Sequence, residues 1–349
     1  MSDKNVVVGI THGDLNGIGY EVIMKALSDP RMIENKTIIV YGSPKVAAYH
    51  RKVLGVENFN FNQINTIEEA HPKRANIINC VDPNVRVDIG KSTPEAGKAS
   101  VEALDAAVAD LKAGKIDVLV TCPINKENVQ QAGFNFPGHT EYLAHNFGGK
   151  KELMLMVSDL MRIGVLTGHI PLSNVAGKVT KAAILEKLQV LTDTLRNDFT
   201  ITNPRIAVLG LNPHAGDKGV IGTEDDTIVA PAIKQANERG MVVAGPFPAD
   251  GFFGSSEFRK YDAILAMYHD QGLVPFKALS FDSGVNFTAG LPIVRTSPGH
   301  GTAFDIAGKN EASEVSLREA IYLAVDAFMH RTDNINLESN KLHFKELSE

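Results

Sequence analysis

Apolar residues in this chain fall into short runs, and the stretches between those runs carry apolar positions at helical spacing. Short runs rich in Val, Ile and Leu are typical of buried strands. They predict strands at Val6–Ile10, Ile38–Gly42, Ile116–Thr121, Leu153–Val157, Ile163–Thr167, Ile206–Gly210 and Ala263–Met267. Strands that alternate with helices indicate an α/β fold with a largely parallel sheet.

Three stretches carry helix-start signals. Thr93 is a suitable N-cap and Pro94 fits the first helical position, while Gly114 can end that helix. A second helix is predicted from Thr180. A third is predicted from Ser316, whose spacing to a glutamate fits a capping box.

Composition narrows the class of protein. A chain of 349 residues suggests about two domains, and 44% hydrophobic with 22% charged residues is typical of a globular protein. A net charge of −6 argues against binding to nucleic acid or to an anionic membrane surface. The N-terminus lacks a signal-peptide pattern, no apolar run is long enough for a membrane span, and two cysteines cannot form a disulfide framework. These features predict a cytoplasmic protein.

Three histidines follow predicted strands in the same way. His169, His214 and His269 each lie a few residues beyond a strand, where ligands bind in parallel α/β folds. Three imidazoles with an open position form a catalytic metal site that is commonly zinc, although other divalent ions also suit imidazole. Asp270 could add an oxygen ligand or orient an imidazole. The alternative is three unrelated loop histidines.

Cationic and polar residues around the last of these strands suit an anionic substrate. Lys277, Asn286 and Arg295 are separated by loops and short apolar runs, and a turn presents His139 and Thr140. Arginine offers a bidentate fork to phosphate or carboxylate, and lysine a point charge. The set predicts a site for a small substrate with two anionic ends. The alternative is solvated surface charge.

Two glycine-rich segments do not match nucleotide-binding motifs. The dinucleotide fingerprint requires Gly-x-Gly-x-x-Gly after a strand. Gly17-Ile18-Gly19 and Gly299-His300-Gly301 both lack the third glycine, and the chain has no Walker A motif. A Rossmann-type nucleotide site and a P-loop kinase are therefore not supported.

Taken together, six segments resemble the 4-hydroxythreonine-4-phosphate dehydrogenase (PdxA) family of the vitamin B6 pathway. In the order of that family they are Thr11-His12-Gly13-Asp14 with Gly17-Ile18-Gly19, Val120–Lys126, Gly138-His139-Thr140-Glu141, Leu211–Gly216, Tyr268–Gly272 and Gly299–Asp305. They span about residues 6–330. The resemblance implies a two-domain isocitrate/isopropylmalate dehydrogenase-like fold with the active site in the interdomain cleft. We place the first domain at residues 1–133 plus 290–349, and the second, with the metal ligands and dimer contacts, at residues 134–289.

The resemblance also assigns roles to residues. It implies a homodimer in which His169, His214 and His269 bind the metal, one of them supplied by the partner subunit. We place Asp270 with these three histidines in the catalytic set. It implies that the substrate contacts His139, Thr140, Lys277, Asn286 and Arg295. A loop like residues 300–310 holds the adenosine half of NAD in related enzymes, which gives cofactor contacts at Gly299, His300, Gly301, Thr302, Asp305 and Asn310. NADP is the alternative cofactor. Zinc is the first choice of metal, with magnesium or cobalt as alternatives.

The implied reaction is oxidation of a phosphorylated hydroxy amino acid, 4-phosphooxy-L-threonine, followed by loss of CO2 to give 3-amino-2-oxopropyl phosphate. Lys126, Asp14 and Asp250 are candidates for the proton donor. Alternatives are the same chemistry on 4-phospho-D-threonate or 4-phospho-D-erythronate, a phosphate acyltransferase, and a metal-dependent binding protein without catalysis.

The first glycine loop departs from the family pattern. Leu15 and Tyr20 stand where the family usually has proline, and Asn16 where it has alanine. Proline fixes the backbone φ angle, so we expect a loop with a less preset backbone.

Overall fold

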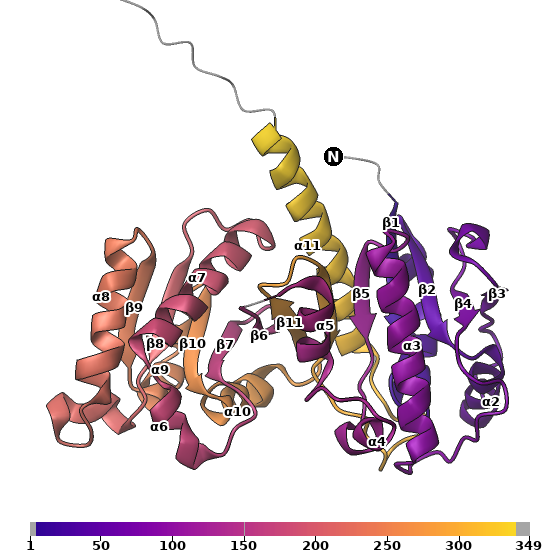
Figure 1. Cartoon of the computed structure of the whole chain (residues 1–349), viewed down its shortest axis with the longest axis horizontal. Helices are drawn as coiled ribbons and strands as arrows, with labels where there is room; N and C mark the ends of the chain where they lie inside the picture. Colours follow the sequence, from indigo (N-terminus) through magenta and orange to yellow (C-terminus); the bar gives the residue numbers. More distant parts are fainter. Residues whose placement is uncertain (1–4, 150, 340–349) are drawn as a thin grey trace, which may run out of the picture.

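The computed structural model describes residues 5–149 and 151–339. In these ranges twelve strands form one continuous sheet in the order β3-β4-β2-β1-β5-β12-β11-β6-β7-β10-β8-β9 (Figure 1). Their bounds are β1 Val6–Thr11, β2 Lys36–Gly42, β3 Asn62–Ile64, β4 Asn76–Asn79, β5 Val118–Thr121, β6 Leu153–Val157, β7 Arg162–Thr167, β8 Arg205–Leu209, β9 Val242–Phe247, β10 Ala263–Tyr268, β11 Val285–Ala289 and β12 Val294–Pro298.

The sheet contains two parallel blocks. The first block consists of the parallel strands β3, β4, β2, β1, β5 and β12. The second block consists of the parallel strands β7, β10, β8 and β9. Between the blocks, β11 pairs antiparallel with both β12 and β6, and β6 pairs antiparallel with β7. The predicted α/β class with a mostly parallel sheet is therefore confirmed. The strands of residues 1–133 and 290–349 occupy one half of the sheet order, but the division into two domains stays a prediction.

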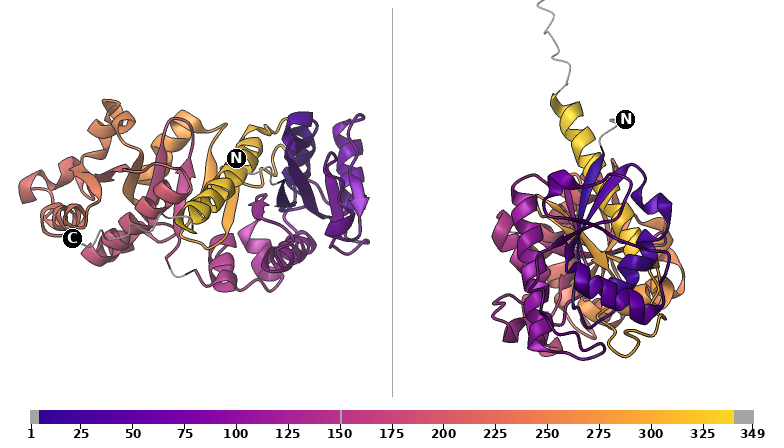
Figure 2. Two further views of the ribbon diagram at one scale, coloured as in Figure 1. Left: turned by 90° about the horizontal axis from the view of Figure 1, so that it is seen from above. Right: turned by 90° about the vertical axis from the view of Figure 1, so that its right-hand side faces the viewer.

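Helices cover both faces of the sheet. The α-helices are α1 Gly19–Leu27, α2 Pro44–Leu54, α3 Pro94–Lys112, α4 Lys126–Gln131, α5 His139–Phe147, α6 Val175–Lys178, α7 Lys181–Asn197, α8 Ala230–Glu238, α9 Ala249–Gly254, α10 His269–Ser280 and α11 Val315–Ser339. The long helix α11 crosses the middle of the molecule and packs on β12, β5 and β11 (Figures 1 and 2). No helix within residues 5–149 and 151–339 is long and apolar enough to cross a membrane.

Burial on two faces explains the unbroken apolar runs. In β2, Ile38 and Val40 join the cluster that contains α1 and α11 residues, whereas Ile39 and Tyr41 join the cluster built on α3. Side chains alternate across a strand, so a strand covered by helices on both sides needs apolar residues at every position.

The sequence predicted most of the central strands and missed others. All seven predicted strands are present, with ends that differ by one or two residues. The Thr93 cap is confirmed, because its hydroxyl accepts a hydrogen bond from the Ala96 amide at 3.2 Å. The Ser316 capping box is wrong. Helix α11 begins at Val315, and the Ser316 hydroxyl donates to the Gly284 carbonyl and accepts from the Gly299 amide.

Two of the residues that depart from the family pattern, Asn16 and Tyr20, anchor the first loop by their side chains. Asn16 donates to the Lys91 carbonyl and accepts from the Asp88 amide, at 2.9 and 2.8 Å. The ring of Tyr20 is buried and stacks between His12 and His50, with centroids 5.1 and 5.2 Å away. The loop is therefore anchored by the hydrogen bonds of Asn16 and by the packing of Tyr20.

Candidate active site

A cavity of about 630 Å³ collects most of the predicted substrate and metal residues. It is bounded by the segment after β5, the start of α5, the segment after β7, helix α10 and strands β6, β11 and β12. Its lining includes His139, Thr140, His169, His269, Lys277, Asn286, Arg295, Gly299, His300 and Gly301. Residues that lie as far apart in the sequence as Thr121 and Gly301 thus surround one cavity.

Two of the three predicted metal ligands lie together. Strands β7 and β10 are parallel neighbours, and Tyr268 is in register with Thr167. His269 follows Tyr268 directly and His169 follows Thr167 by two residues, which brings the ring centroids within 5.6 Å. The strand-end pattern in the sequence therefore located two histidines that are neighbours in space, and their role as metal ligands stays a prediction.

The third histidine lies apart from this pair within one chain. His214 does not line the cavity, and among residues 5–149 and 151–339 no three His, Cys, Asp or Glu side chains are placed to hold a metal. The backbone after β8 has an unusual path at this point. Six successive residues, His214–Gly219, have positive φ, so the chain turns with left-handed geometry.

The His169 and His269 pair has the chemistry of part of a metal site. Burial, the positive charge of Lys126 and the neighbouring His269 lower the pKa of His169, which favours the neutral imidazole that binds metals. The Asp270 carboxylate contacts Nδ1 of His269 at 2.6 Å, which leaves Nε2 of that ring for a ligand. Two imidazoles suit a divalent ion that takes its further ligands from elsewhere.

Arg295 is a buried cation without a carboxylate partner among the described residues. It is 3% exposed, and its guanidinium donates to the hydroxyl of Thr121 and to that of Thr288 at 3.0 Å. Burial lowers its pKa to about 10, while the negative charge of Glu141 acts in the opposite direction. A buried charge that meets only hydroxyl groups is costly, and an anion bound in the cavity would compensate it.

The N-terminus of α5 adds a second feature that suits an anion. This helix of nine residues begins at His139, after Gly138 with extended backbone. Its first amide groups have no partner within the helix and favour a negative ligand. Burial, Arg295 and Lys126 hold the pKa of His139 well below its ordinary value, and its buried Nε2 has no hydrogen-bond partner among the described residues.

Further polar groups face the same cavity. Asn286 lies on β11, and its buried Oδ1 lacks a partner among the described residues. Lys277 lies on α10 and Lys126 at the start of α4, both with exposed side chains. Neither ammonium group takes part in an ion pair within the described ranges. The cavity is therefore rich in positive charge, with Glu141 and Glu152 as its acidic members.

The predicted cofactor loop packs against the first glycine loop. The Ile18 amide donates to the Thr302 carbonyl at 3.1 Å, and a Cβ on Gly17 would lie 2.7 Å from that oxygen, so this approach requires glycine. Lys25 donates to the Asn310 carbonyl at 3.0 Å. Gly299, His300 and Gly301 line the cavity, whereas Thr302, Asp305 and Asn310 lie outside its lining. The buried Nε2 of His300 has no partner in the described part of the chain, and its pKa is lowered by burial.

The structure separates the three candidate proton donors. Lys126 lines the cavity, and its charge acts on both His139 and His169. Asp14 is buried outside the cavity, where it accepts hydrogen bonds from Asn128 and from the Asn16 amide. Burial raises the pKa of Asp14. Asp250 is exposed on α9 and is not in the lining.

Some site residues carried a signal that sequence reasoning did not use. Glu141 belongs to the segment already singled out for His139 and Thr140, and it lines the cavity. Thr121 ends a predicted strand and holds Arg295, a role that depends on the pairing of β5 with β12. No local pattern would have shown that contact.

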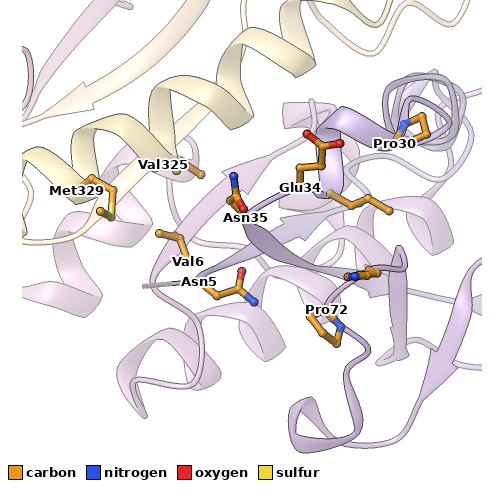
Figure 3. Close-up of a pocket in the computed structure, with 10 residues that line it drawn as sticks. Asn5, Val6, Pro30, Glu34, Asn35, Pro72, Val325 and Met329 are labelled. Atoms are coloured by element: carbon orange, nitrogen blue, oxygen red, sulfur yellow. The ribbon is translucent and has the colours of Figure 1, made fainter. Parts of the chain in front are cut away.

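A larger cavity of about 770 Å³ lies elsewhere, at the starts of β1 and β2 and beside α11 (Figure 3). It is lined by Asn5, Val6, Pro30, Ile33, Glu34, Asn35, Pro72, Lys73, Val325 and Met329. It contains neither a histidine nor an arginine, so the chemistry described above belongs to the smaller cavity.

Comparison with known sequences identifies the family. A family profile described as "Pyridoxal phosphate biosynthetic protein PdxA" matches residues 34–324. The chain is 53% identical over 332 residues to a 4-hydroxythreonine-4-phosphate dehydrogenase of Bacteroides thetaiotaomicron, a match that covers 95% of this chain and 91% of that protein. The chain belongs to the PdxA family. The resemblance found in the sequence is thereby confirmed.

Other PdxA relatives support the fold and widen the range of substrates. The solved structure of a 4-hydroxythreonine-4-phosphate dehydrogenase from Klebsiella pneumoniae is similar with a TM-score of 0.79 and 34% identity, covering 93% of this chain and all (100%) of that one. A protein of Oceanobacillus iheyensis, provisionally assigned as a D-threonate 4-phosphate dehydrogenase, is 38% identical over 93% of this chain and 98% of its own length. PdxA membership therefore fixes the fold, and more than one substrate is named among its relatives.

Proposed function

We propose that the protein is an NAD-dependent, metal-assisted dehydrogenase that oxidises 4-phosphooxy-L-threonine and decarboxylates the product to 3-amino-2-oxopropyl phosphate, in pyridoxal phosphate biosynthesis. The observation that carries the proposal is Arg295, a buried guanidinium that faces the same cavity as His169 and His269. A phosphorylated hydroxy acid supplies an anion that Arg295 can bind. It also supplies a hydroxyl group for a metal held by the two histidines. The 53% identity to a protein named for this activity supports the same substrate.

The anionic ends of the substrate would be held by groups already in place. Arg295, the N-terminal amides of α5 and the neutral His139 imidazole form one donor set, with Thr140, Asn286 and Lys277 around it. Arginine is held rigidly by Thr121 and Thr288, so little ordering remains when an anion binds. Such positioning matters because hydride transfer tolerates little misorientation.

The oxidation needs groups that the chain does not itself provide. A divalent cation, when bound at His169, His269 and a third ligand, supplies Lewis-acid activation of the hydroxyl and stabilisation of negative charge. NAD, when bound, supplies the hydride acceptor, and we assign its adenosine half to the loop that includes His300, Thr302, Asp305 and Asn310. Zinc is the metal we propose, with magnesium or cobalt as alternatives, and NADP is the alternative to NAD.

Lys126 is the residue we assign to proton donation. Loss of CO2 from a β-keto acid leaves a carbanion-like carbon that must take up a proton. Lys126 carries its ammonium at the edge of the cavity near His139 and His169, whereas Asp14 and Asp250 lie outside it. A positioned donor of this kind typically accelerates its step by about 10²–10⁴-fold.

We further propose a homodimer in which His214 of one subunit completes the metal site of the other. Each of the two histidine segments that would meet carries an exposed apolar side chain. Leu172, close to His169, is 72% exposed, and Val220, close to His214, is 80% exposed. Exposed apolar groups of this size next to predicted ligands favour an interface. We also propose that the site lies between two domains with the bounds given above, and that the protein is cytoplasmic.

The alternative substrate is 4-phospho-D-threonate or 4-phospho-D-erythronate, which the O. iheyensis relative supports by its name. A phosphate acyltransferase is a more distant alternative, favoured only by a shared fold with a phosphotransacetylase of Staphylococcus aureus at 14% identity and a TM-score of 0.52. It would not need the histidine pair.

One experiment separates these functions. NADH formation is followed by absorbance with each of the three phosphorylated acids, with and without a chelator. We expect the highest kcat/KM with 4-phosphooxy-L-threonine and loss of activity in chelator. Preference for a sugar-acid phosphate would replace the substrate assignment, and activity that survives stripping of the metal would contradict the metal role.

A further inference from the structure

The segment after β8 has a backbone that ordinary residues avoid. From His214 to Gly219, six successive residues have φ between 45° and 89°. Four of them, His214, Ala215, Asp217 and Lys218, are not glycine. Left-handed geometry crowds Cβ against the following carbonyl, so single residues adopt it occasionally and runs of them almost never. Such a run persists only where the surrounding structure over-determines it.

The carboxylate of Asp225 holds the segment that leads into this turn. It is fully buried, and it accepts hydrogen bonds from the amides of Leu211 and Asn212, at 2.7 and 3.0 Å. The side-chain amide of Asn212 donates to the same carboxylate at 3.0 Å and to Glu224 at 2.9 Å. The two residues that lead into the turn are thereby held by one buried acceptor.

Close packing beneath the turn leaves no room for another path. A Cβ on Gly210 would lie 3.0 Å from Cα of Ala215 and 3.1 Å from Oδ1 of Asp225. A Cβ on Gly216 would lie 2.7 Å from the Gly222 carbonyl oxygen. The turn is thus closely packed against Asp225, and the His214 side chain is exposed.

We propose that Asp225 is a positioning residue whose carboxylate holds the left-handed turn His214–Gly219 so that the His214 imidazole is presented to the metal site of a partner subunit. This inference rests on the proposed function, because it gives His214 its role. It goes further because it names Asp225 as the residue that orients the His214 imidazole. It also gives a reason why the chain adopts an unfavourable backbone conformation in this turn. An exposed histidine on a flexible loop would sample many orientations, and this would lower the metal affinity of a shared site.

The first test uses the purified full-length protein reconstituted with zinc. Apparent zinc affinity is measured by competition with a chelating dye, together with the thermal midpoint and the kcat and KM values. Asp225→Asn replaces one acceptor oxygen by an amide that cannot accept. We expect zinc affinity to fall by about 10- to 100-fold, as for groups that orient metal ligands. KM for the phosphorylated substrate should change less than threefold, because the anion-binding residues lie elsewhere.

Asp198→Asn is the matched control. Asp198 is also a buried carboxylate, 3% exposed, but it pairs with Arg331 far from both histidine segments. We expect its loss to lower the thermal midpoint without changing zinc affinity. If both variants lowered zinc affinity alike, general destabilisation would explain the effect and the inference would be overturned.

A second pair of variants tests the backbone itself and does not depend on Asp225 folding normally. Lys218 is exposed and adopts φ of 54°. Lys218→Gly suits this conformation, whereas Lys218→Val opposes it. We expect the glycine variant to keep wild-type zinc affinity and a thermal midpoint at least as high, and the valine variant to lose affinity severalfold. Equal affinity in the two would overturn the inference.

The outcomes also separate this inference from the function on which it rests. If the wild-type protein bound no zinc, or if His214→Ala left its affinity unchanged, the proposed shared site would be wrong and the inference with it. If His214→Ala abolished tight binding while Asp225→Asn and Lys218→Val did not, the proposed function would stand and the positioning role would fall.

Discussion

Nε and Nη2 of Arg295 both donate to a single oxygen, the hydroxyl of Thr121, which lies at the end of the neighbouring strand. A buried guanidinium usually pairs with a carboxylate. Here the charge of Glu141 acts on Arg295, but the two form no ion pair within the described residues. The free protein therefore retains an uncompensated charge that a bound anion would satisfy.

Replacing Arg295 by Met should separate binding from stability. Loss of charge-assisted hydrogen bonds worth about 3 kcal/mol should raise KM for the phosphorylated substrate by roughly 100-fold. The free energy of unfolding without ligand should not fall, because the variant removes a buried charge that lacks a carboxylate partner. Steady-state kinetics and urea unfolding measure the two effects. Arg205→Met, which removes an exposed arginine paired with Asp262, is the control and should leave KM unchanged.

Replacing Lys126 by Met should lower kcat by about 100-fold or more and change KM little, because a proton donor acts on the reaction step. Lys126→Arg keeps the charge but cannot give up its proton at neutral pH. We expect the arginine variant to be nearly as slow as the methionine variant in a stopped-flow assay of CO2 release. An arginine variant as fast as wild type would show that only the charge is needed.

Tyr20 should be a stability residue in this chain. Its hydroxyl accepts a hydrogen bond from the Ser43 amide at 2.9 Å in a buried setting. Tyr20→Phe leaves that amide without a partner and should cost about 1–3 kcal/mol of unfolding free energy. Chemical denaturation measures the loss, and kcat at 25 °C should remain that of wild type. A change in kcat without a change in stability would contradict this interpretation.

Stability should decline below neutral pH because of two buried histidines. Burial is the first cause that lowers the pKa of His12 and of His50 to about 4 in the folded protein, against about 6.5 in an unfolded chain. The unfolded state therefore binds more protons between these values. The contribution is complete above about pH 6.5 and is lost as pH falls toward 4, at a cost of about 3 kcal/mol for each histidine.

Urea unfolding at pH 7.5 and pH 5 measures this dependence. His50 contacts the Leu15 carbonyl through Nε2 at 2.8 Å, and His50→Gln can keep that hydrogen bond without titrating. The variant should show a smaller loss between the two pH values. A pH dependence equal to that of wild type would mean that His50 does not contribute.

Mixing two inactive variants should restore activity if the metal site is shared between subunits. His169→Ala and His214→Ala each remove one ligand, but a mixed dimer contains one site with both histidines intact. Random exchange at equal concentrations should give about a quarter of the wild-type activity. No recovery after exchange, with mixed dimers shown by native mass spectrometry, would place all ligands in one chain.

Patterns of neighbouring residues in the sequence predicted the strands that are made of apolar runs. Apolar runs located β7 and β10, and their parallel pairing was enough to bring His169 and His269 together. Strand β12 was missed because it ends in Pro298 and carries the polar residues Arg295, Thr296 and Ser297 within a short run. These polar groups are satisfied by tertiary partners that the sequence does not reveal.

The position of His214 shows a different limit. Its sequence context matches those of the other two histidines, and the prediction of a common cleft followed from that match. The chain instead enters a left-handed turn, and the amides of two residues before that turn donate to the carboxylate of Asp225. Residue types such as Ala215 and Lys218 do not predict positive φ, so the direction of this turn could not be inferred from the sequence.

Continuity of the sheet has a practical consequence for anyone who recombines this chain with its relatives. Asn286 is in register with Ser297, and Arg295 donates to Thr288, so the cavity-lining groups of β11 and β12 are spaced by one hydrogen-bonded ladder. A crossover between these strands would pair β11 of one parent with β12 of another in the wall of the cavity. Chimeras that keep residues 285–298 from a single parent should therefore retain substrate affinity even when the outer strands come from another enzyme.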